Sequence, residues 1–332
     1  MKAPYFWSAG LDPKSREAAP LTRLLLTPFS MLYLWGLRRK LAAASPETAP
    51  VPVICIGNLT AGGAGKTPVT ESIRNRINAA GVRAASLSRG HGGAERGPLQ
   101  VDLSRHAARD VGDEPLLLAQ SGEAWIGRER PAAARAMAED GVQAILMDDG
   151  HQNPSLNKDL TLIVIDAGAP FGNGEILPRG PLREKVPDGL ARAQAVVLMG
   201  EGPVPREVIA SGLTVLRARL VPVEAPPAGA LVAFAGIGRP QKFFDSLAEA
   251  GGQVADAVPF ADHHPYSKGD LQFLRSLAQD RAARLITTTK DHVRLPPEVR
   301  QEIHAWPVTA VFEDTAALDA VLAPIFKALS LP

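Results

Sequence analysis

A glycine-rich segment at residues 57–67 carries the clearest chemical signal in the sequence. It is GNLTAGGAGKT and lies between an apolar run and a stretch with helical spacing. Glycines let backbone N–H groups turn inward around phosphate oxygens, and the start of the next helix adds its positive end. Lys66 in this pattern reaches the β- and γ-phosphates of a nucleotide, and the Thr67 hydroxyl holds Mg²⁺. The pattern therefore predicts a phosphate-binding loop formed by Thr60, Ala61, Gly62, Gly63, Ala64, Gly65, Lys66 and Thr67.

The loop departs from the usual G-x4-G-K-[ST] pattern because Thr60 stands where the first glycine is expected. The alternative interpretation is a glycine-rich turn with an incidental lysine. We disfavour it because a strand, three glycines, a Lys-Thr pair and a helix occur in the order that a phosphate loop requires.

Two adjacent acids follow a second apolar run. Asp148 and Asp149 close the run at 144–147, and an acid at such a strand end is the usual Mg²⁺ partner in phosphate-loop enzymes. Neighbouring residues of a strand point to opposite faces, so we expect one acid to serve the metal and the other to face substrate or packing. A plain polar strand end is the alternative.

Two segments farther along could supply acid–base groups and positive charge. Asp113 lies in VGDEP, whose ordinary interpretation is a helix N-terminus with favourable charge. His263 lies in DHHPY, and an Asp and a His brought together across a cleft could orient a hydroxyl and accept its proton. In LPRGPLRE, either Arg179 or Arg183 could neutralise phosphoryl charge, or both could be solvated.

Composition excludes several functional classes. The 332 residues contain 36 Lys+Arg and 35 Asp+Glu, a net charge of +1, which argues against a nucleic-acid partner. Aromatic residues make up 5%, too few for a base-stacking platform. The single cysteine, Cys55, excludes a disulfide framework and a multi-cysteine zinc site, and its apolar surroundings predict a small buried hydrophobe.

Strands alternating with helices must position these groups. Short apolar, mostly β-branched runs predict buried strands at 51–56, 84–87, 144–147, 160–166 and 195–199, with helices at 67–81 and 129–140. This rhythm predicts an α/β fold with a phosphate-loop NTPase-like parallel sheet and helices on both faces. Ligands bind at the carboxyl ends of such strands, where the motifs fall.

A second, smaller α/β domain is predicted in the last third of the chain. Residues 213–223 alternate like a half-exposed strand and end in prolines, and a run at 308–312 could pair with them as a two-stranded linker. The predicted divisions are an N-terminal helix (1–45), a phosphate-loop core (46–212), a linker strand (213–228), a second α/β domain (229–305), and a return strand with a C-terminal helix (306–332).

The N-terminal apolar segment at 24–37 allows two interpretations. It is too short and too interrupted to span a bilayer, and its basic cluster at 38–40 follows the apolar part, which argues against an export signal. It could be a helix packed on its own domain. We favour a helix in a membrane interface, with Tyr33 and Trp35 at headgroup depth and the basic cluster facing anionic lipid.

Taken together, these stretches resemble the tetraacyldisaccharide 4′-kinase (lipid A 4′-kinase) family. The family's loop also lacks the first glycine, and a basic-flanked apolar helix belongs to its pattern. The matching segments run in family order over most of the chain: GNLTAGGAGKTP (57–68), SRGHGG (88–93), VGDEP (111–115), DDGHQN (148–153), LPRGPLRE (177–184), AFAGIGRPQKFFDSL (233–247), FADHHPYS (260–267) and TTKDHVRL (288–295).

The resemblance implies a reaction and a location. It implies ATP- and Mg²⁺-dependent transfer of the γ-phosphoryl group to the 4′-hydroxyl of a tetraacyldisaccharide 1-phosphate, giving the bis-phosphorylated lipid A precursor. The partners would be this glycolipid and the cytoplasmic face of the inner membrane, held peripherally or monotopically through the N-terminal helix. No obligate protein partner is evident. Closure of the second domain over ATP would exclude water and limit hydrolysis.

The resemblance also implies roles for site residues. Asp113 would act as the base with help from His263, chosen over His264 because it directly follows Asp262. The remaining implied residues are Lys66 and Thr67 for phosphate and metal, Asp148 and Asp149 for Mg²⁺, and Glu184, which would assist at the cleft. His151 replaces the aromatic residue expected in a DDGFQ-type segment, and no chemical role depends on it.

Two alternative functions stay open at this point. A phosphate-loop GTPase switch or metallochaperone would prefer GTP and bind a partner protein, but TTTKD (287–291) matches the guanine-reading NKxD pattern only weakly. A soluble small-molecule kinase would pack its N-terminal helix as core.

Overall fold

A nine-stranded, mostly parallel sheet forms the first domain of the computed structural model, which describes residues 4–12 and 14–329. Its strand order is β13-β8-β7-β6-β1-β5-β2-β4-β3, so β1 lies near the centre, between β5 and β6. The strands are β1 (Val53–Gly57), β2 (Ala84–Ser88), β3 (Leu99–Gln100), β4 (Ala124–Ile126), β5 (Ala144–Asp148), β6 (Leu160–Asp166), β7 (Ala195–Met199), β8 (Thr214–Pro222) and β13 (Val308–Phe312). Only β3 and β13 run antiparallel to their neighbours.

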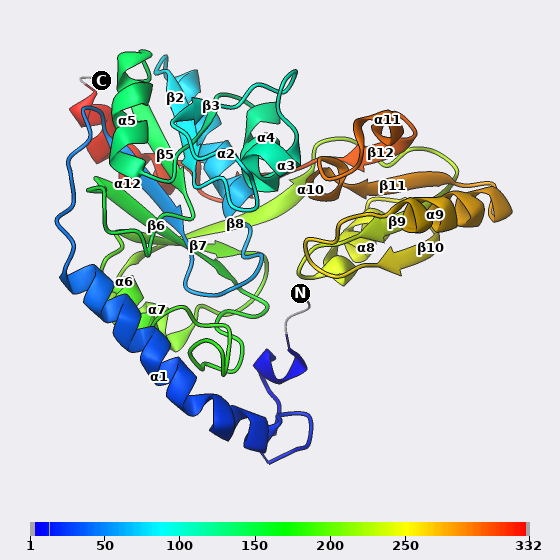
Figure 1. The fold of residues 1–332 in the computed structure, drawn as a ribbon, viewed down its shortest axis with the longest axis horizontal. Helices are drawn as coiled ribbons and strands as arrows, with labels where there is room; N and C mark the ends of the chain where they lie inside the picture. Colours follow the sequence, from blue (N-terminus) through cyan, green and yellow to red (C-terminus); the bar gives the residue numbers. More distant parts are fainter. Residues whose placement is uncertain (1–3, 13, 330–332) are drawn as a thin grey trace.

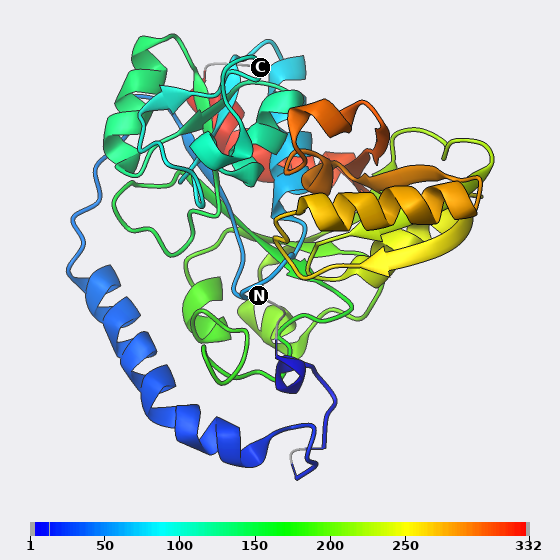
Figure 2. The same cartoon turned by 45° about the vertical axis from the view of Figure 1, so that its right-hand side comes forward.

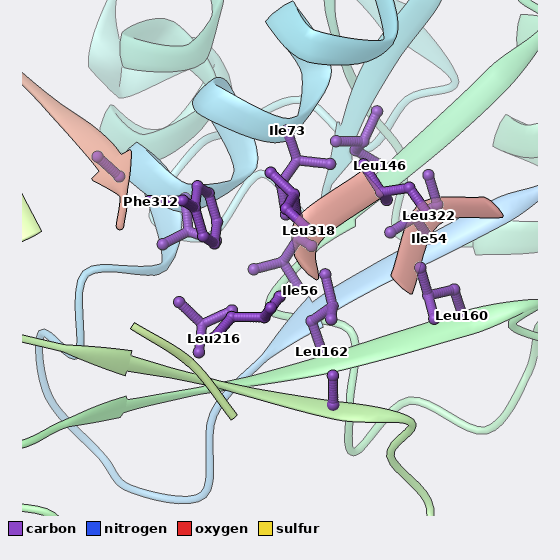
Figure 3. Close-up of a cluster of buried hydrophobic side chains, with 14 of the residues drawn as sticks. Ile54, Ile56, Ile73, Leu146, Leu160, Leu162, Leu216, Phe312, Leu318 and Leu322 are labelled. Carbon is purple, nitrogen blue, oxygen red and sulfur yellow. The ribbon is translucent and has the colours of Figure 1, made fainter. Parts of the chain in front are cut away.

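Helices cover both faces of this sheet, as predicted. Alternate residues of each strand point to opposite faces, so Ile54 and Ile56 face one layer while Val53 faces the other. On the first face lie α2 (Lys66–Ala79) and α12 (Thr315–Ala328), whose side chains interlock with those of the central strands (Figure 3). The second face carries α5 (Arg130–Glu139), α6 (Val186–Leu190) and α7 (Arg206–Ser211).

The second domain is a four-stranded parallel sheet with helices on both faces. Its strand order is β10-β9-β11-β12. Its elements are β9 (Ala230–Ala235), α8 (Pro240–Glu249), β10 (Gln253–Pro259), α9 (Lys268–Asp280), β11 (Arg284–Thr288), α10 (Thr289–His292), α11 (Pro297–Arg300) and β12 (Ile303–Trp306). Figure 1 shows this domain beside the first, reached through β8. The two-domain α/β architecture is therefore as predicted.

The two strands predicted as a linker pair with each other, but they also belong to the first sheet. β13 pairs antiparallel with β8, and β8 pairs parallel with β7. Leu318 and Leu322 of α12 are buried in the core of the first domain together with Phe312 of β13. The return strand and the C-terminal helix are thus structural parts of the phosphate-loop domain.

The N-terminal helix α1 (Pro20–Ala42) follows a 3-10 turn at Tyr5–Trp7 and runs along the outside of the first domain (Figures 1 and 2). Its only buried residue is Ser30. Large apolar side chains stand in solvent along it: Leu21, Leu24, Leu25, Phe29, Met31, Leu32, Tyr33 and Trp35. The helix lies on its own domain, where Ser30 donates to the Ile176 carbonyl and Arg23 pairs with Glu175, but its large apolar side chains do not pack as core. Within the described ranges, no helix has the length and apolarity needed to cross a membrane.

Candidate active site at the domain boundary

The phosphate loop leaves β1 at its carboxyl end and enters α2 at Lys66. Gly65 has φ 87°, a conformation that suits glycine, and it forms the turn into the helix. At the loop's start, a Cβ on Gly57 would lie 2.4 Å from the Cβ of His151, so only glycine fits there. The Asn58 side chain donates to the Thr60 carbonyl at 2.7 Å, which holds the loop where the pattern lacks its first glycine. The segment predicted as a phosphate loop thus connects a buried strand to the start of a helix.

Lys66 is buried and faces the second of the two acids. Its Nζ lies 3.5 Å from Oδ1 of Asp149, and Arg183 Nη1 donates to the same oxygen at 2.7 Å. Burial alone would raise the pKa of Asp149, but the charges of Lys66 and Arg183 lower it to about 2. Of the two arginines of LPRGPLRE, Arg183 thus lies at the site, whereas Arg179 pairs with Glu175 beside α1.

Asp148 points to the other side, toward α2. Its carboxylate is within 3.4 Å of the Thr67 hydroxyl and 3.3 Å of the Thr70 hydroxyl. Burial raises the pKa of Asp148 because it disfavours the charged carboxylate, and a cation bound beside that carboxylate would stabilise its charged form. The expectation that Asp148 and Asp149 serve different partners agrees with this arrangement.

The oxygen set of Thr67 and Asp148 fits a magnesium ion. Mg²⁺ prefers oxygen ligands and usually takes one or two carboxylates, with phosphate oxygens and water completing its shell. Among residues 4–12 and 14–329, no group of three or more His, Cys, Asp or Glu side chains is placed to hold a metal. A site completed by nucleotide phosphates suits this arrangement better than an all-protein cage.

Asp113 and His263 meet across the boundary between the domains. Asp113 is the first residue of α4 (Asp113–Gln120), which follows the short helix α3 (Ala108–Val111) in the first domain. Nδ1 of His263 lies 3.0 Å from Oδ2 of Asp113. His264 turns away and contacts Asp270 at 3.0 Å. The structure thus brings His263, and not His264, to Asp113.

Two cationic side chains that the sequence interpretation missed surround this pair. Arg294 Nε donates to Oδ2 of Asp113 at 2.6 Å, and Lys290 Nζ lies 3.5 Å from Nε2 of His263. Burial would raise the pKa of Asp113, but hydrogen bonds from His263 and Arg294 and the Arg294 charge hold it well below its usual range. The only sequence signal for either cation was its place in the TTKDHVRL segment.

Glu184 lies behind the phosphate loop rather than beside Asp113. It is 2% exposed, and both of its oxygens accept from Arg192 Nη2, at 2.9 and 2.7 Å. Gln152 Nε2 donates to Glu184 at 2.9 Å and to the Asn58 carbonyl at 3.0 Å. These contacts fit a residue that braces the start of the loop.

His151 takes the place of an aromatic core residue. Its Nε2 lies 3.1 Å from the Gly189 carbonyl, and burial lowers the pKa of the imidazole to about 3. A neutral ring here packs as an aromatic side chain does.

The second domain lies directly against the phosphate loop. A Cβ on Gly238 would lie 3.6 Å from the Gly63 nitrogen. On the same side, Lys242 Nζ pairs with Asp166 at 2.9 Å, and Arg239 pairs with the same carboxylate. The phosphate loop and the Asp113–His263 pair therefore both lie at the boundary between the domains.

Comparison with known proteins assigns the chain to a family. A model of the family described as "Tetraacyldisaccharide-1-P 4'-kinase" matches residues 22–327. The chain belongs to this kinase family. A tetraacyldisaccharide 4'-kinase of Hyphomonas neptunium is 82% identical over the full length of both chains. The enzyme of the same name from Maricaulis maris is 48% identical and covers 99% of this chain and 97% of its own.

A solved structure has the same fold as this member of the 4'-kinase family. It is LpxK from Aquifex aeolicus, described as a complex with ATP, which is 24% identical and superposes with a TM-score of 0.71. The match covers 92% of this chain and 99% of that chain. The α/β fold class and the resemblance seen in the sequence are both confirmed.

Proposed function

We propose that the protein transfers the γ-phosphoryl group of ATP to the 4′-hydroxyl of a tetraacyldisaccharide 1-phosphate, giving the bis-phosphorylated lipid A precursor. Membership of the 4'-kinase family supports the reaction class and the acceptor. The observation that carries the mechanism is the placement of the Asp113–His263 pair opposite a phosphate loop. One boundary thus supplies both a phosphate cradle and a pair able to receive a hydroxyl proton.

The first domain would hold the nucleotide. The backbone of residues 60–65 and the N-terminus of α2 cradle the phosphates, while Lys66 neutralises charge on them. Thr67 and Asp148 would hold Mg²⁺, with Asp149 ordering Lys66 and Arg183 beside it. The ion, when bound, neutralises the charge that develops on the β- and γ-phosphoryl oxygens.

The Asp113–His263 pair would receive the acceptor hydroxyl. When Nδ1–H of His263 donates to Asp113, Nε2 is an acceptor, and Lys290 Nζ lies 3.5 Å from it. A carboxylate with a pKa far below its usual range holds a proton poorly. The proton of the 4′-hydroxyl would therefore end on Nε2 of His263 rather than on Asp113, the base expected from the family resemblance, while Asp113 orients the ring and stabilises its charged form. Phosphoryl transfer has a loose transition state, so the protein contributes mainly by positioning the reacting groups and stabilising charge.

The helix α1 would bring the enzyme to its lipid substrate. Long acyl chains leave a bilayer at a cost of about 0.8 kcal/mol per CH₂, so a kinase for this acceptor works best at the membrane surface. Leu24, Leu25 and Phe29 of α1 are 61–74% exposed, and a basic cluster at 38–40 lies at the helix end. These features support a peripheral or monotopic position on the cytoplasmic face of the inner membrane.

The burial and hydrogen bonds of Asp291 argue against the GTPase alternative. In an NKxD-type motif the acid must be free to read the guanine base. Here Asp291 is fully buried and accepts hydrogen bonds from the Thr288 hydroxyl at 2.7 Å and from Arg294 Nη1 at 2.9 Å.

The test is a product assay in mixed micelles. Purified protein is incubated with γ-labelled ATP, Mg²⁺ and a tetraacyldisaccharide 1-phosphate, beside the Lys66→Ala variant. We expect a labelled bis-phosphorylated lipid with the wild type, and at least a hundredfold less with the variant. Wild-type protein that hydrolyses GTP but labels no lipid would overturn the proposal.

A further inference from the structure

Arg294 lies where groups from both domains converge on Asp113. Its Nε donates to Asp113 Oδ2 at 2.6 Å, while its Nη1 donates to Asp291 at 2.9 Å and to the Gly236 carbonyl at 2.8 Å. Its Nη2 lies 3.2 Å from Nδ1 of His263. The Arg294 side chain is 7% exposed, so these contacts are shielded from water.

We propose that Arg294 is the positioning residue that captures Asp113 when the second domain closes on the phosphate loop, and so assembles the Asp113–His263 pair. The inference rests on the function proposed above. Arg294 would act through Asp113 and would not itself touch the reacting atoms.

The second domain fixes Arg294 in advance. Asp291 is buried at the first turn of α10, where the Thr288 hydroxyl caps the helix and donates to its carboxylate. Asp291 in turn holds one edge of the Arg294 guanidinium, and the Gly236 carbonyl accepts from the same nitrogen. A planar guanidinium presents donors in a fixed fork, so anchoring one edge aims the other. A lysine in this place would offer a point charge without that direction.

Asp113 is the one member of this set that comes from the first domain. Arg294, Asp291 and His263 all belong to the second domain, and α10 lies beside α4 (Figures 1 and 2). If the second domain moved away, Asp113 would lose both His263 and Arg294, while the Arg294–Asp291 pair would stay intact. Capture of Asp113 is therefore coupled to closure.

A neighbouring apolar contact packs the two domains together independently of the Arg294 charge. Val293, next to Arg294, is fully buried in a cluster with Leu116 and Leu118 of α4. This apolar packing does not involve the guanidinium, so loss of the Arg294 charge alone can be tested in a folded protein.

Removal of the Arg294 charge should also change the way in which kcat/KM depends on pH. The charged groups around the pair are Arg294 and Lys290 on the cationic side, and Asp262 and Asp291 on the anionic side. The Arg294 cation holds the pKa of Asp113 down. Without it, the acid limb of kcat/KM should move to higher pH, because the pair then binds a proton more readily.

The test compares Arg294→Gln and Arg294→Lys with Lys242→Met. Lys242 pairs with Asp166 at another contact between the domains, and its side chain is half exposed. Arg239 pairs with the same carboxylate, so Lys242→Met removes a charge at the boundary while that contact and the Asp113–His263 pair remain. We expect Arg294→Gln to lower kcat by about 10- to 100-fold, to leave KM for ATP within about twofold, and to shift the acid limb upward. Arg294→Lys should return the acid limb of the kcat/KM pH profile to its wild-type position but restore only part of kcat. Lys242→Met should leave that limb unchanged.

A second measurement does not depend on lipid turnover. The imidazole resonance of His263 is followed through a pH titration by NMR in wild type, Arg294→Gln and Lys242→Met. The midpoint should move to higher pH in Arg294→Gln alone. An unchanged midpoint and an unchanged kcat in Arg294→Gln, or the same change in Lys242→Met, would overturn the inference. Failure of the proposed function would instead show as a wild type that labels no lipid while the His263 titration still responds to Arg294.

Discussion

Asp113 and His263 are 150 residues apart in the sequence, yet Nδ1 of the histidine lies 3.0 Å from Oδ2 of the aspartate. Each residue belongs to a different domain, and the contact exists only because the second domain lies against the phosphate loop. A group that receives the acceptor proton is thus assembled together with the closed nucleotide site. This arrangement links proton transfer to the exclusion of water.

Gly57 should be essential for stability because of a close approach in the first domain. A Cβ at this position would lie 2.4 Å from the Cβ of His151, which lies in the loop just after Asp148, the last residue of β5. Gly57→Ala should lower the free energy of unfolding by about 1–3 kcal/mol or more, measured by urea denaturation. Gly63→Ala is the matched control, since a Cβ there meets nothing within 4 Å. Equal stability of the two variants would contradict the assignment.

Cys55 should be inert to thiol reagents in the native protein. It is the only cysteine, it is fully buried in β1, and burial raises the pKa of its thiol to about 11. At pH 8 we expect no modification by iodoacetamide until denaturant unfolds the first domain, after which one label per chain should appear by mass spectrometry. Rapid labelling of the folded enzyme would show that β1 is accessible and that the sheet is packed differently.

The exposed face of α1 should drive binding to membranes. Replacement of Leu25 and Phe29 by glutamate removes apolar surface and adds negative charge, so binding to vesicles with anionic lipid should fall by about tenfold or more, at an unchanged melting temperature. Cosedimentation measures the bound fraction. Phe273→Glu serves as the control, because Phe273 is an exposed aromatic residue on α9 in the second domain. The membrane role fails if the control weakens binding as much as the α1 variant does.

Asp149 should matter for catalysis through its contacts with Lys66 and Arg183. Asp149→Asn keeps the shape of the side chain but removes the charge that both cations face. We expect kcat to fall by about 10²- to 10³-fold, with a smaller change in the melting temperature. Glu175→Gln is a suitable control, since Glu175 pairs with Arg179 away from the loop. A normal kcat in Asp149→Asn would exclude Asp149 from the site.

The phosphate loop and the central strands could be predicted because their signals are local. β-branched runs, three glycines and a Lys-Thr pair define β1, the loop and α2 within about 25 residues. Strands β3, β4, β10 and β12 were missed, and β3 and β4 have only two and three residues. In β10 exposed and half-buried residues alternate along an edge of the second sheet, and β12 has only four residues, so neither gives a continuous apolar run.

Contacts between the domains could not be predicted in the same way. His263 and His264 are equivalent in the sequence, and the choice between them depends on a backbone turn, in which His263 has φ 57° and faces Asp113. Arg294 lies in the TTKDHVRL segment, but nothing in that segment points to Asp113, which lies 181 residues away in the other domain. Glu184 was expected at the cleft, and only the structure shows its pairing with Arg192 behind the loop.

The most direct test of the account is a double-mutant cycle on Asp113 and His263. The kcat/KM for lipid phosphorylation is measured in wild type, Asp113→Asn, His263→Gln and the double variant, with the melting temperature of each as a check on folding. If the two residues act as one unit, each single change should lower kcat/KM by at least about a hundredfold, and the double variant should be little worse than the poorer single variant. Losses that simply multiply, or a normal rate in either single variant, would contradict the claim that the pair assembled at the domain boundary receives the hydroxyl proton.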